Sequence, residues 1–446
     1  MKIYLESLGC SRNQVDSEIM LGRLVAAGHQ MITDPAQADA IIVNTCGFIS
    51  TASQEAVDVI LEMAEFKTTG SCRRLVVTGC LVQRYKDDPD LLDSLPEVDA
   101  FLGTAACDHI VKAVENTDKM PFTLFPEPDA RQVDTPVQAR ELLNEKIAYI
   151  KVSEGCSRHC TYCIIPTLRG RQRSRPIELI CREASALLDK GVKEIILTAE
   201  NTTDYGLDLA GPAFHTVLEK TSKKMAQKDP SAWLRFLYTH PRTLDERVIE
   251  AVQRHANICS YYDVPIQHAH DEVLKRMGRP YTGQDLIRLF SDIRRLDPDA
   301  ALRTTIIVGF PGETDQQFKD LLAFIQEVEF DFLGVFTYSD SQDLPAHKLS
   351  GHIPEDVAEL RHDTIMAAQA KISEKRNARH VGRVYPVLVE ENPEDGVYIG
   401  RTQFQAPEVD GVTFIYSDGL DTGSLVQVKI TDAFEYDIAG EQDIGK

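Results

Sequence analysis

Residues 148–163 read AYIKVSEGCSRHCTYC, a short strand-like run followed by three cysteines. The cysteines are Cys156, Cys160 and Cys163, in the spacing C-x-x-x-C-x-x-C. A four-iron cluster that is held by only three thiolates keeps one iron open to a substrate or cofactor. In parallel α/β folds, binding groups collect where a strand ends and a loop begins. The stretch therefore predicts a parallel α/β core with a reactive iron-sulfur site after one of its strands.

A structural zinc site is the main alternative use of these cysteines. Zinc sites generally combine two short Cys or His pairs a dozen or more residues apart, and no second pair of this kind is present. A disulfide framework is also disfavoured, because 10 cysteines in 446 residues are sparse and the start MKIYLESLGC lacks the pattern of a secretory signal. The cysteine pattern thus favours an iron-sulfur protein of a reducing compartment.

The bulk composition indicates a cytoplasmic protein of several domains. With 446 residues and 43% hydrophobic side chains, the chain can build two to four cores. Its longest apolar runs, such as TTIIVGF, are strand-sized and far below the roughly 20 residues that span a bilayer. The formal net charge of -21 repels phosphate backbones and favours basic partners. The alternative is that this charge only keeps the protein soluble.

The first segment, residues 1–137, is predicted to be a parallel α/β domain. Strand-like runs KIYLES, AIIVNT and RLVVTG alternate with helical stretches around 17–28 and 51–65. A cysteine follows each run, and the carboxyl ends of parallel strands meet at one sheet edge, where ligands bind. The pattern predicts a second three-thiolate site, with isolated buried thiols as the alternative. Its cysteines are Cys10, Cys46 and Cys80, with Cys107 after DAFLGT as a candidate fourth neighbour.

The second segment, residues 142–375, alternates strands and helices on a larger scale. A proline- and acid-rich connector, MPFTLFPEPDARQVDTP, precedes it. Each strand-like run is followed by a helix-like span, which gives six β/α units, too few for a closed eight-fold barrel. We therefore expect an open partial barrel with its active site at the carboxyl-terminal mouth. The runs are AYIKV, EIILTA, LRFLYT, YYDVPI, LRTTIIVGF and FLGVFTY.

Polar residues and glycines after these strands are candidates for the mouth. Glu200 follows the second strand, Gln267 and His268 follow the fourth, and Gly309 and Gly312 follow the fifth. Glycine lets a backbone approach a ligand closely, although a plain strand-to-helix turn uses the same residues. A histidine in such a place is more often a hydrogen-bonded wall residue than a catalyst.

A basic stretch follows the three cysteines of the first motif. It contains no acidic residue before Glu178 and stands out against the acidic chain. Its charge is suited to steering an anionic cofactor, to balancing a negatively charged cluster or to binding nucleic acid, and residue types alone do not choose among these. The arginines are Arg158, Arg169, Arg171, Arg173 and Arg175.

The third segment, residues 377–446, is predicted to be a small β-barrel. Short strand-like runs such as RVYPVLVEE, GVYIGR and VTFIYS are separated by Gly and Asp turns. Five basic residues stand against thirteen acidic ones, a net charge of about -8. RNA-binding barrels need a cationic face, so this segment is suited to a basic protein partner.

CSRHCTYC resembles the signature of radical S-adenosylmethionine (SAM) enzymes, with Tyr162 at the aromatic position before the last cysteine. The whole chain resembles one branch of them, the methylthiotransferases, which combine an amino-terminal cluster domain, a radical SAM partial barrel and a carboxyl-terminal TRAM domain. Within that branch it resembles the enzymes that modify a ribosomal protein more than those that modify tRNA. The motifs are SLGCSRNQVDSE, VNTCGFI, GCSRHCTYCIIPTLRGRQRSR, VPIQH, LRTTIIVGFPGET, APEVDG and ITDAFEYDIAGE.

The resemblance implies a role for the first cysteine motif. Cys156, Cys160 and Cys163 would be the catalytic cysteines that hold a 4Fe-4S cluster, whose open iron is chelated by SAM. One electron would cleave SAM to methionine and a 5'-deoxyadenosyl radical, which removes hydrogen from an unactivated carbon. The cofactor-binding residues would be Tyr162, Glu200, Gln267 and Gly309.

The resemblance also implies a second 4Fe-4S cluster on Cys10, Cys46 and Cys80, which carries or supplies sulfur. A second SAM, making two per turnover, would methylate that sulfur. The methylthio group would then reach the β-carbon of an aspartate in the small-subunit ribosomal protein numbered twelve. The expected electron donor is of the flavodoxin or ferredoxin type, and the protein is expected to be a monomer that binds neither membranes nor nucleic acid.

The chain departs from the family pattern at two places. Family members commonly have Gln-Asp-Thr-Ser after the second strand, where this chain has Glu200 followed by Asn-Thr-Thr, and Asp343 stands where a glycine is usual. Two other functions remain open. A tRNA methylthiotransferase would use the arginines to hold an anticodon loop, and a non-enzymatic iron-sulfur scaffold would transfer clusters without cleaving SAM.

Overall fold

The computed structural model describes residues 1–88, 94–116, 121–133, 140–211 and 213–445. These residues form two compact units. The first contains Met1–His159, Cys163–Glu183 and Thr198–Glu200, and the second contains Cys160–Tyr162, Ala184–Leu197 and the chain from Asn201 onward. The predicted end of the first domain at residue 137, part of the connector and residue 446 lie outside the described residues.

The amino-terminal sheet has six parallel strands in the order β2-β1-β3-β4-β5-β6. This confirms the predicted parallel α/β domain. Every residue of β3 and β4 is buried, as expected for central parallel strands that are covered on both faces. The strands are β1 (Lys2–Ser7), β2 (Gln30–Met31), β3 (Ala40–Thr45), β4 (Arg74–Gly79), β5 (Ala100–Leu102) and β6 (Phe122–Leu124).

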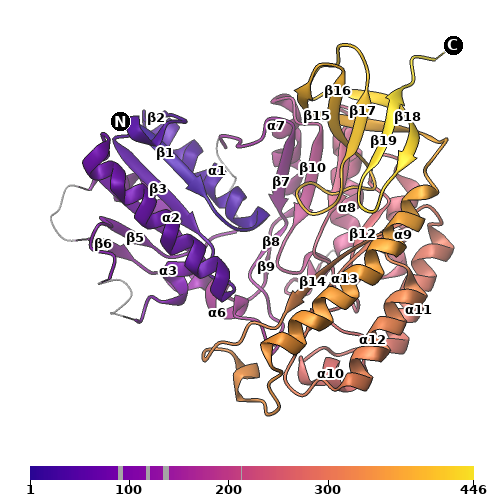
Figure 1. Cartoon of the computed structure of the whole chain (residues 1–446). Helices are drawn as coiled ribbons and strands as arrows, with labels where there is room; N and C mark the ends of the chain where they lie inside the picture. Colours follow the sequence, from indigo (N-terminus) through magenta and orange to yellow (C-terminus); the bar gives the residue numbers. More distant parts are fainter. Residues whose placement is uncertain (89–93, 117–120, 134–139, 212, 446) are drawn as a thin grey trace. The chain divides into compact units, whose positions relative to one another are not determined.

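Helices cover both faces of this sheet (Figure 1). On one face, α1 (Ser11–Ala26) and α5 (Ile110–Glu115) pack against the strands through side chains such as Met20 and Ile110. On the other face, α2 (Ser50–Thr69) and α3 (Cys80–Arg84) do so. Strand β2 is added on one side of β1, and β3 to β6 are added on the other side. The order in which strands are added therefore reverses between β1 and β3, which makes this a topological switch point.

Two predicted boundaries in this unit are wrong. Helix α1 begins at Ser11, directly after Cys10, and not near residue 17, because its first turns bury the polar Asn13 and Asp16, which hydrophobic periodicity does not detect. The predicted connector contains strand β6, which pairs with β5. It also contains the 3-10 turn η3 (Pro128–Ala130), and two other such turns are η1 (Pro35–Gln37) and η2 (Cys107–His109).

The six predicted core strands are all present. They are β7 (Ile147–Lys151), β10 (Glu194–Thr198), β11 (Trp233–Phe236), β12 (Tyr261–Asp263), β13 (Ala301–Val308) and β14 (Phe332–Thr337). Within the second unit, β10–β11, β12–β13 and β13–β14 pair in parallel. Hydrogen bonds from Leu234 N to Asn257 O (2.7 Å) and from Cys259 N to Leu234 O (2.8 Å) join β11 to the segment before β12. Among the described strands β14 has β13 as its one neighbour, so the array is open as predicted.

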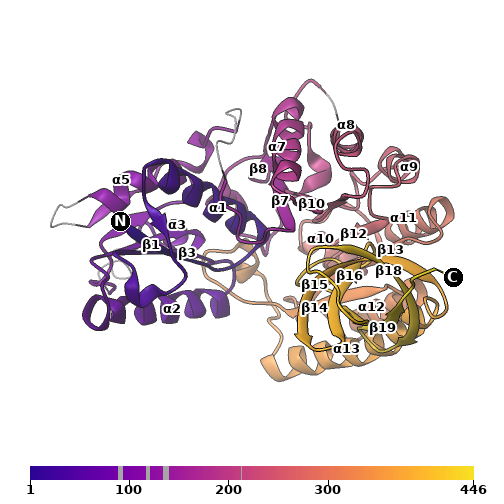
Figure 2. The ribbon, with the colours of Figure 1, turned by 90° about the horizontal axis from the view of Figure 1, so that it is seen from above.

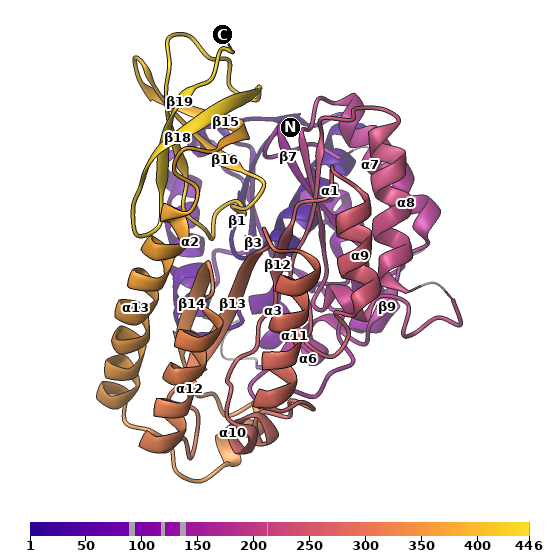
Figure 3. The same ribbon diagram turned by 90° about the vertical axis from the view of Figure 1, so that its right-hand side faces the viewer.

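Each of these strands is followed by helical structure, which Figure 3 shows for α11, α12 and α13 lying side by side. From β7 the chain runs through β8 (Ser153–Glu154), α6 (Ile165–Arg169) and β9 (Arg173–Ser174) to α7 (Ile177–Asp189), and β8 pairs with β9 in antiparallel fashion. The second unit contains α8 (Phe214–Ala226), α9 (Glu246–Arg254), α10 (Asp271–Arg276), α11 (Gly283–Leu296), α12 (Asp315–Val328) and α13 (Glu355–Ala378). Its 3-10 turns are η4 (Thr202–Asp204) and η5 (Pro345–Lys348).

The carboxyl-terminal segment forms a closed five-stranded barrel, as predicted, and Figure 2 looks into it. Its strands are β15 (Val384–Glu394), β16 (Val397–Thr402), β17 (Thr413–Tyr416), β18 (Leu425–Ala433) and β19 (Ile438–Gln442). Val387, Ile415 and Ile430 are fully buried inside it. The described exposed basic residues are Arg383 and Lys429, against the exposed acidic Glu391, Glu394, Asp395, Glu408, Asp418, Asp421, Asp432, Glu435, Glu441 and Asp443.

Buried ion pairs attach this barrel to the amino-terminal part of the core strands. Glu194, the first residue of β10, contacts Arg235 of β11 and Arg401 of β16, each at 2.6 Å, and all three side chains are at most 2% exposed. Asp410 contacts Arg303 of β13 at 3.3 Å. The predicted mouth residue Gly309 directly follows β13 and stands six residues beyond Arg303, which corresponds to about 20 Å of extended chain. The barrel is therefore seated at the end of the strands remote from the predicted mouth.

A buried histidine makes the seat of the barrel sensitive to acid. The His380 ring is stacked on Phe404 with ring centroids 4.1 Å apart, and Nδ1 lies 2.8 Å from the Tyr385 hydroxyl. Burial, with the nearby Arg379, Arg383 and Arg376 outweighing Asp331, lowers the pKa of His380 to about 3 from 6.5. The folded protein therefore keeps this ring neutral while the unfolded chain binds a proton below pH 6.5.

We expect this histidine to make the protein less stable as pH falls. Its contribution is complete above pH 6.5 and is lost progressively toward pH 3, which amounts to about 2 kcal/mol between pH 7 and pH 5. In His380→Phe, which keeps a ring against Phe404, the drop in the free energy of unfolding between these pH values should be smaller by that amount. Urea unfolding of both proteins at pH 7 and pH 5 measures it, and equal drops would contradict the prediction.

No helix among the described residues is both long enough and apolar enough to cross a membrane.

Candidate functional site

Three of the predicted thiols come together at the switch point of the amino-terminal sheet. Cys10 follows β1 as the N-cap of α1, Cys46 follows β3, and Cys80 is the first residue of α3 directly after β4. These three strands are neighbours in the sheet, so their carboxyl ends lie at one edge. Gly9 has φ = +95°, and a Cβ there would lie 2.9 Å from the Cβ of Cys46. A side chain at position 9 would therefore push apart the segments that carry Cys10 and Cys46.

The electrostatics of these thiols show that they interact. Burial raises the pKa of the Cys80 thiol to about 12, Arg169 opposes that rise, and Cys10 and Cys46 add to it. Burial also raises the pKa of Cys46, and Cys10 again adds to the rise. We call these three thiols, which follow neighbouring strands at one sheet edge, the thiol triad.

The amide of Asn13 contacts the segments that carry all three thiols. It lies in the first turn of α1 and is 1% exposed. Its Nδ2 donates to the carbonyls of Leu8 (3.0 Å) and Thr45 (2.9 Å), which precede Cys10 and Cys46, and the Cys80 sulfur lies 3.8 Å from its Oδ1. The side chain of one residue thus fixes the backbone around the thiol triad.

A buried network of charges borders the thiol triad. Asp16 of α1 and Glu154 of β8 accept from Lys151, Arg131 and Arg169, and Lys151 reaches each carboxylate at 2.6 Å. Arg169 extends from this network to the triad, with Nη2 3.7 Å from the sulfur of Cys80. The three cations outnumber the two carboxylates by one, so the network carries one excess positive charge beside Cys80.

These observations fit a group that carries negative charge and is bound by the thiol triad. Thiolates are the usual ligands of iron-sulfur clusters, and the buried excess positive charge would be balanced by a cluster anion. No three His, Cys, Asp or Glu side chains in the described part of the chain are placed to hold a single metal ion. The thiolates of a cluster each bind a different iron, so they stand farther apart than the ligands of one ion.

The first cysteine of the C-x-x-x-C-x-x-C loop is held by backbone contacts in the first unit. Cys156 N donates to Gly170 O at 3.0 Å, and its sulfur accepts from Arg158 N at 3.4 Å. Gly155 has φ = +76°, and a Cβ there would collide with the carbonyls of Gly170 and Arg171. The loop is thus folded back on the segment after α6 before its second cysteine. Cys163 is half-buried just before α6.

The middle of the same loop is fastened within the second unit. Thr161, next to Cys160, donates from its N to Met277 O (3.0 Å) and accepts at its carbonyl from Ala346 N (2.9 Å). The Tyr162 ring meets Phe310 edge-on with centroids 6.5 Å apart, and the Arg279 guanidinium lies 5.9 Å from its centre. The predicted Tyr162 therefore packs against the residue that follows Gly309.

Glu200, the predicted residue that departs from the family pattern, is paired. Arg12 Nε lies 3.0 Å from its Oε1, and Arg12 Nη1 donates to Ala199 O at 3.2 Å. Ser11 and Thr198 hydroxyls also meet at 3.3 Å. Arg12 stands two residues after Cys10 in the first turn of α1, so the start of α1 contacts the residues at and after the end of β10. The extra negative charge of a glutamate at this position is thus balanced by Arg12.

The predicted mouth residues lie beyond the carboxyl ends of β12 and β13. Gln267 is in the left-handed region (φ = +68°) and bridges to Ile306, with Ile307 N donating to its carbonyl at 2.8 Å. Gly309 also has positive φ, and a Cβ there would lie 2.6 Å from the Cβ of Ala358. His268 is fully buried with Nε2 3.4 Å from Glu313, and burial lowers its pKa. It is a wall residue and does not face solvent.

Most of the arginine stretch is used inside the protein. Arg169 and Arg175 are buried, and Arg175 pairs with Glu183 at 2.7 Å. Arg173 donates to the carbonyls of Pro128 (2.9 Å) and Arg131 (2.6 Å). Arg158 is half-buried, and Arg171 has an 87% exposed side chain. The stretch therefore balances buried charge and fixes backbone, which leaves little of it for an RNA backbone.

Two other residues singled out in the sequence lie outside these groups. The Cys107 sulfur donates to Thr104 O (3.4 Å) and lies 3.9 Å from Arg131 Nη1, and none of its described contacts reaches the thiol triad. Asp343 is exposed and accepts from the Ser341 hydroxyl at 2.6 Å.

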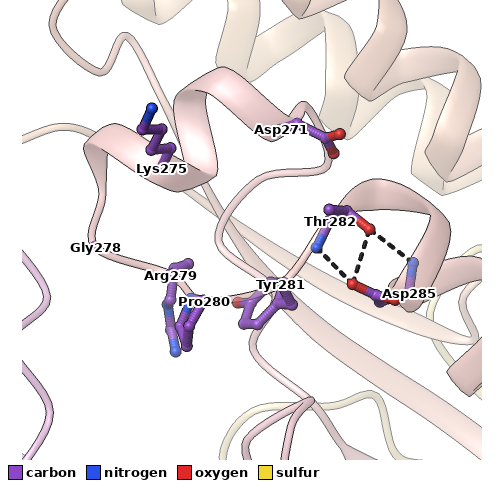
Figure 4. A pocket seen from close by; sticks show the side chains of 8 residues that line it. All are labelled: Asp271, Lys275, Gly278, Arg279, Pro280, Tyr281, Thr282 and Asp285. Atoms are coloured by element: carbon purple, nitrogen blue, oxygen red, sulfur yellow. Dashed lines mark hydrogen bonds between the residues drawn. The ribbon is translucent and has the colours of Figure 1, made fainter.

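The structure also contains a cavity of about 420 Å³ between α10 and α11 (Figure 4). Arg279 and Tyr281 line it, together with Asp271 and Asp285. The two carboxylates cap the start of α11, because Asp271 accepts from Gly283 N (2.7 Å) and Asp285 accepts from Thr282 N (3.0 Å). None of the predicted site residues lines this cavity.

Sequence reasoning missed Asn13, Arg12 and Arg279. Asn13 and Arg12 follow Cys10 within one helical turn, which only the true start of α1 would have revealed. The sequence identifies Arg169 only as one of the five arginines of the basic stretch, for which balancing the charge of a cluster is one of three possible roles.

Known protein families match each of the three predicted segments of the chain. Family profiles match residues 2–103 (Uncharacterized protein family UPF0004), residues 150–325 (Radical SAM superfamily) and residues 381–442 (TRAM domain). The chain is 49% identical over 445 residues to a protein of Desulfosudis oleivorans named "Ribosomal protein uS12 methylthiotransferase RimO", covering 99% of this chain and 100% of the relative. It is 46% identical to the protein of the same name from Clostridioides difficile, covering 99% and 98%.

Among solved structures, a radical SAM methyltransferase, TsrM from Kitasatospora setae, is similar in fold. The TM-score is 0.58 with 14% sequence identity, and the similarity covers 83% of this chain and 89% of that one. At this identity the likeness concerns the fold alone.

Proposed function

This chain belongs to the RimO family of SAM-dependent methylthiotransferases, and from that premise we propose that it adds a methylthio group to an aspartate of a basic small-subunit ribosomal protein. The target atom is the β-carbon of that aspartate, and the protein is the one numbered twelve. The domains involved are residues 1–137, 142–375 and 377–446. The protein acts as a cytoplasmic monomer and receives electrons from a flavodoxin- or ferredoxin-type donor.

The observation that carries this proposal is the thiol triad on a chain that also has the C-x-x-x-C-x-x-C loop. Thiolation of an unactivated carbon needs a radical generator and a sulfur donor, and two three-thiolate sites would supply both. In this proposal Cys156, Cys160 and Cys163 hold one 4Fe-4S cluster, and Cys10, Cys46 and Cys80 hold another. When bound, the first cluster with SAM supplies the radical, and the second supplies or carries the sulfur.

The protein's own residues would position these groups. The contacts of Thr161, Tyr162 and Arg279 hold the cysteine loop in one conformation. Gln267 and Gly309 would present backbone at the mouth, and the absence of a side chain at position 309 lets that backbone pack against Ala358. The Arg12–Glu200 pair would keep the charge beside SAM neutral. Such preorganisation is what a protein contributes to cofactor chemistry.

An anaerobic assay tests the proposed function. Reconstituted protein is mixed with excess SAM and a reductant, and the basic ribosomal protein or bulk tRNA is added in separate tubes. Mass spectrometry should find a methylthio group on an aspartate-containing peptide. Modification of an adenosine nucleoside alone would mean that the enzyme acts on tRNA. Cluster transfer without formation of 5'-deoxyadenosine would mean that the protein is a scaffold.

The charge of the barrel favours the protein substrate over tRNA, and a set of variants tests this. Replacing Glu391, Glu394 and Asp395 in the β15–β16 hairpin by Gln, Gln and Asn should raise KM for the ribosomal protein by about tenfold, because it removes attraction for a basic partner. kcat and the KM for SAM should stay the same, since the barrel is seated away from the mouth. Initial rates at low and moderate salt measure this.

The matched control removes three exposed acidic residues elsewhere. Replacing Glu55, Asp58 and Glu62 of α2 by their amides changes the net charge by the same amount. Equal increases in KM for both triple variants would mean that only the net charge matters and that the barrel has no special role.

A further inference from the structure

The guanidinium of Arg169 lies beside the thiol triad, and the proposed function of the protein assigns it no role. Arg169 is the last residue of α6, six positions after Cys163, and is 2% exposed. Its Nη2 faces both the Cys80 sulfur, at 3.7 Å, and Asn13 Oδ1. Its Nη1 donates to Asp16 (2.7 Å) and Glu154 (3.2 Å). The two carboxylates thus hold the guanidinium in place through Nη1, while Nη2 points at the Cys80 sulfur.

The charges around Arg169 favour an anion on the side of the guanidinium that faces the Cys80 sulfur. Asp16 and Glu154 together carry two negative charges and are shared by three cations. The Nε of Arg169 is buried and has no hydrogen-bond partner among the described residues. A buried charge without a counter-charge is costly, so a negative group bound by Cys80 would stabilise the excess positive charge.

Asn13 makes the arrangement rigid. Its Oδ1 accepts from Arg169, and its Nδ2 is committed to two backbone carbonyls on the other side of the triad. The guanidinium therefore cannot swing away from Cys80 without breaking these hydrogen bonds. A fixed charge close to a ligand atom shifts the electronic properties of the bound group more than a mobile one does.

We propose that Arg169 donates a charge-assisted N–H···S hydrogen bond to the Cys80 thiolate and so raises the reduction potential of the cluster on Cys10, Cys46 and Cys80. This inference rests on the proposed function, because it requires a cluster at the thiol triad. Reduction adds negative charge to a cluster, and a nearby positive charge and hydrogen bonds to its sulfurs favour the reduced form. Arg169 is a positioning residue in this role and does not contact the substrate.

The test uses the full chain with Cys156, Cys160 and Cys163 replaced by Ala, so that the cluster can form on the thiol triad alone. After anaerobic reconstitution, the midpoint potential is measured by a redox titration followed by EPR, and iron loss is followed with a ferrous chelator. In this background Arg169→Gln should lower the midpoint potential. It should also release iron about 10-fold faster, as is usual when a hydrogen-bond partner of a metal ligand is lost.

Two matched variants separate the proposed contact from a general effect. Arg131→Gln removes a guanidinium from the same two carboxylates without touching Cys80, and should shift the potential much less. Arg169→Lys keeps the positive charge but loses the paired N–H groups of the guanidinium. Iron loss should therefore increase, while the midpoint potential should stay close to that of the background protein. If circular dichroism shows that Arg169→Gln does not fold, Arg169→Lys replaces it as the test variant, with faster iron loss as the expected result.

Two results would overturn the inference in different ways. An unchanged potential in Arg169→Gln, or an equal shift in Arg131→Gln, would remove the role of Arg169 and leave the proposed function intact. If the background protein binds no iron-sulfur cluster while the chain with all cysteines binds one, the thiol triad is not a cluster site. The proposed function would then fail together with this inference.

Discussion

Replacing Cys156, Cys160 and Cys163 by alanine is expected to abolish SAM cleavage, to the background of the assay. These cysteines are the proposed ligands of the iron that binds SAM, and no other described group of thiols lies in the same loop. Formation of 5'-deoxyadenosine under reduction, measured by chromatography, should fall to that of a sample without protein. Bound iron should fall to about four atoms per chain, those of the other cluster.

Replacing Cys10, Cys46 and Cys80 should have the complementary effect. SAM cleavage should continue, because these thiols lie on a separate sheet edge, whereas transfer of the methylthio group should stop. Mass spectrometry of the ribosomal protein measures transfer, and the same samples give 5'-deoxyadenosine. The two triple variants thus separate radical generation from sulfur delivery.

The control for both is Cys181→Ser, which changes a half-buried cysteine of α7 that belongs to neither set. It should leave both activities and the iron content as in the unchanged protein. If the second triple variant lost SAM cleavage while its circular dichroism stayed native, the assignment of separate roles to the two sets would be wrong.

Glu194→Ala is expected to lower the free energy of unfolding by about 3–5 kcal/mol, the usual cost of leaving buried charges without their partner. Arg235 would lose its carboxylate partner, and Arg401 would keep only Glu390 as a carboxylate partner. Glu194 lies 2.6 Å from each arginine, and both arginine side chains are at most 2% exposed. Because Arg401 belongs to the barrel and Arg235 to the core, this change should loosen the barrel first.

The protein contains its own probe for this measurement. Trp233 is the only tryptophan of the chain and is 2% exposed. It pairs with Glu194 across β10 and β11. Urea unfolding followed by tryptophan fluorescence should therefore report on this junction. Glu194→Gln keeps the shape of the side chain and loses its charge. Its free energy of unfolding should lie between those of the unchanged protein and Glu194→Ala.

The control is Glu391→Ala, at an exposed acidic position on the same barrel. Surface changes of this kind usually alter stability by less than about 0.5 kcal/mol. If Glu194→Ala cost no more than this control, the buried ion pairs would not be what attaches the barrel to the core.

Much of the fold could be predicted because the strands are short apolar runs with a regular alternation of helices. The position of the thiol triad also followed, since a cysteine ends each of three runs and parallel strands end at one edge. The start of α1 could not be predicted, because Asn13 and Asp16 are polar residues that are buried by their own hydrogen bonds. Their burial depends on Arg169 and Lys151, more than a hundred residues away in the sequence.

The pairing of Glu200 with Arg12 was beyond sequence reasoning for the same reason. In the sequence a glutamate at that position indicates an extra negative charge. Only the structure shows that Arg12, 188 positions earlier, is its partner. The seat of the barrel was not predictable either, because the residues that form it, such as Glu194 and Asp410, look like ordinary surface acids in the sequence. Long-range contacts between single polar residues leave no periodic pattern.

The thiol triad has a consequence for the order in which the protein matures. Its cysteines are spread over seventy positions, from Cys10 to Cys80, and meet only once β1, β3 and β4 have paired. Cys156, Cys160 and Cys163 lie within eight residues and stay near one another even in an unfolded chain, where closing so short a loop costs little entropy. A newly made chain can therefore capture iron at the C-x-x-x-C-x-x-C loop at once, while the thiol triad comes into existence only as a product of folding.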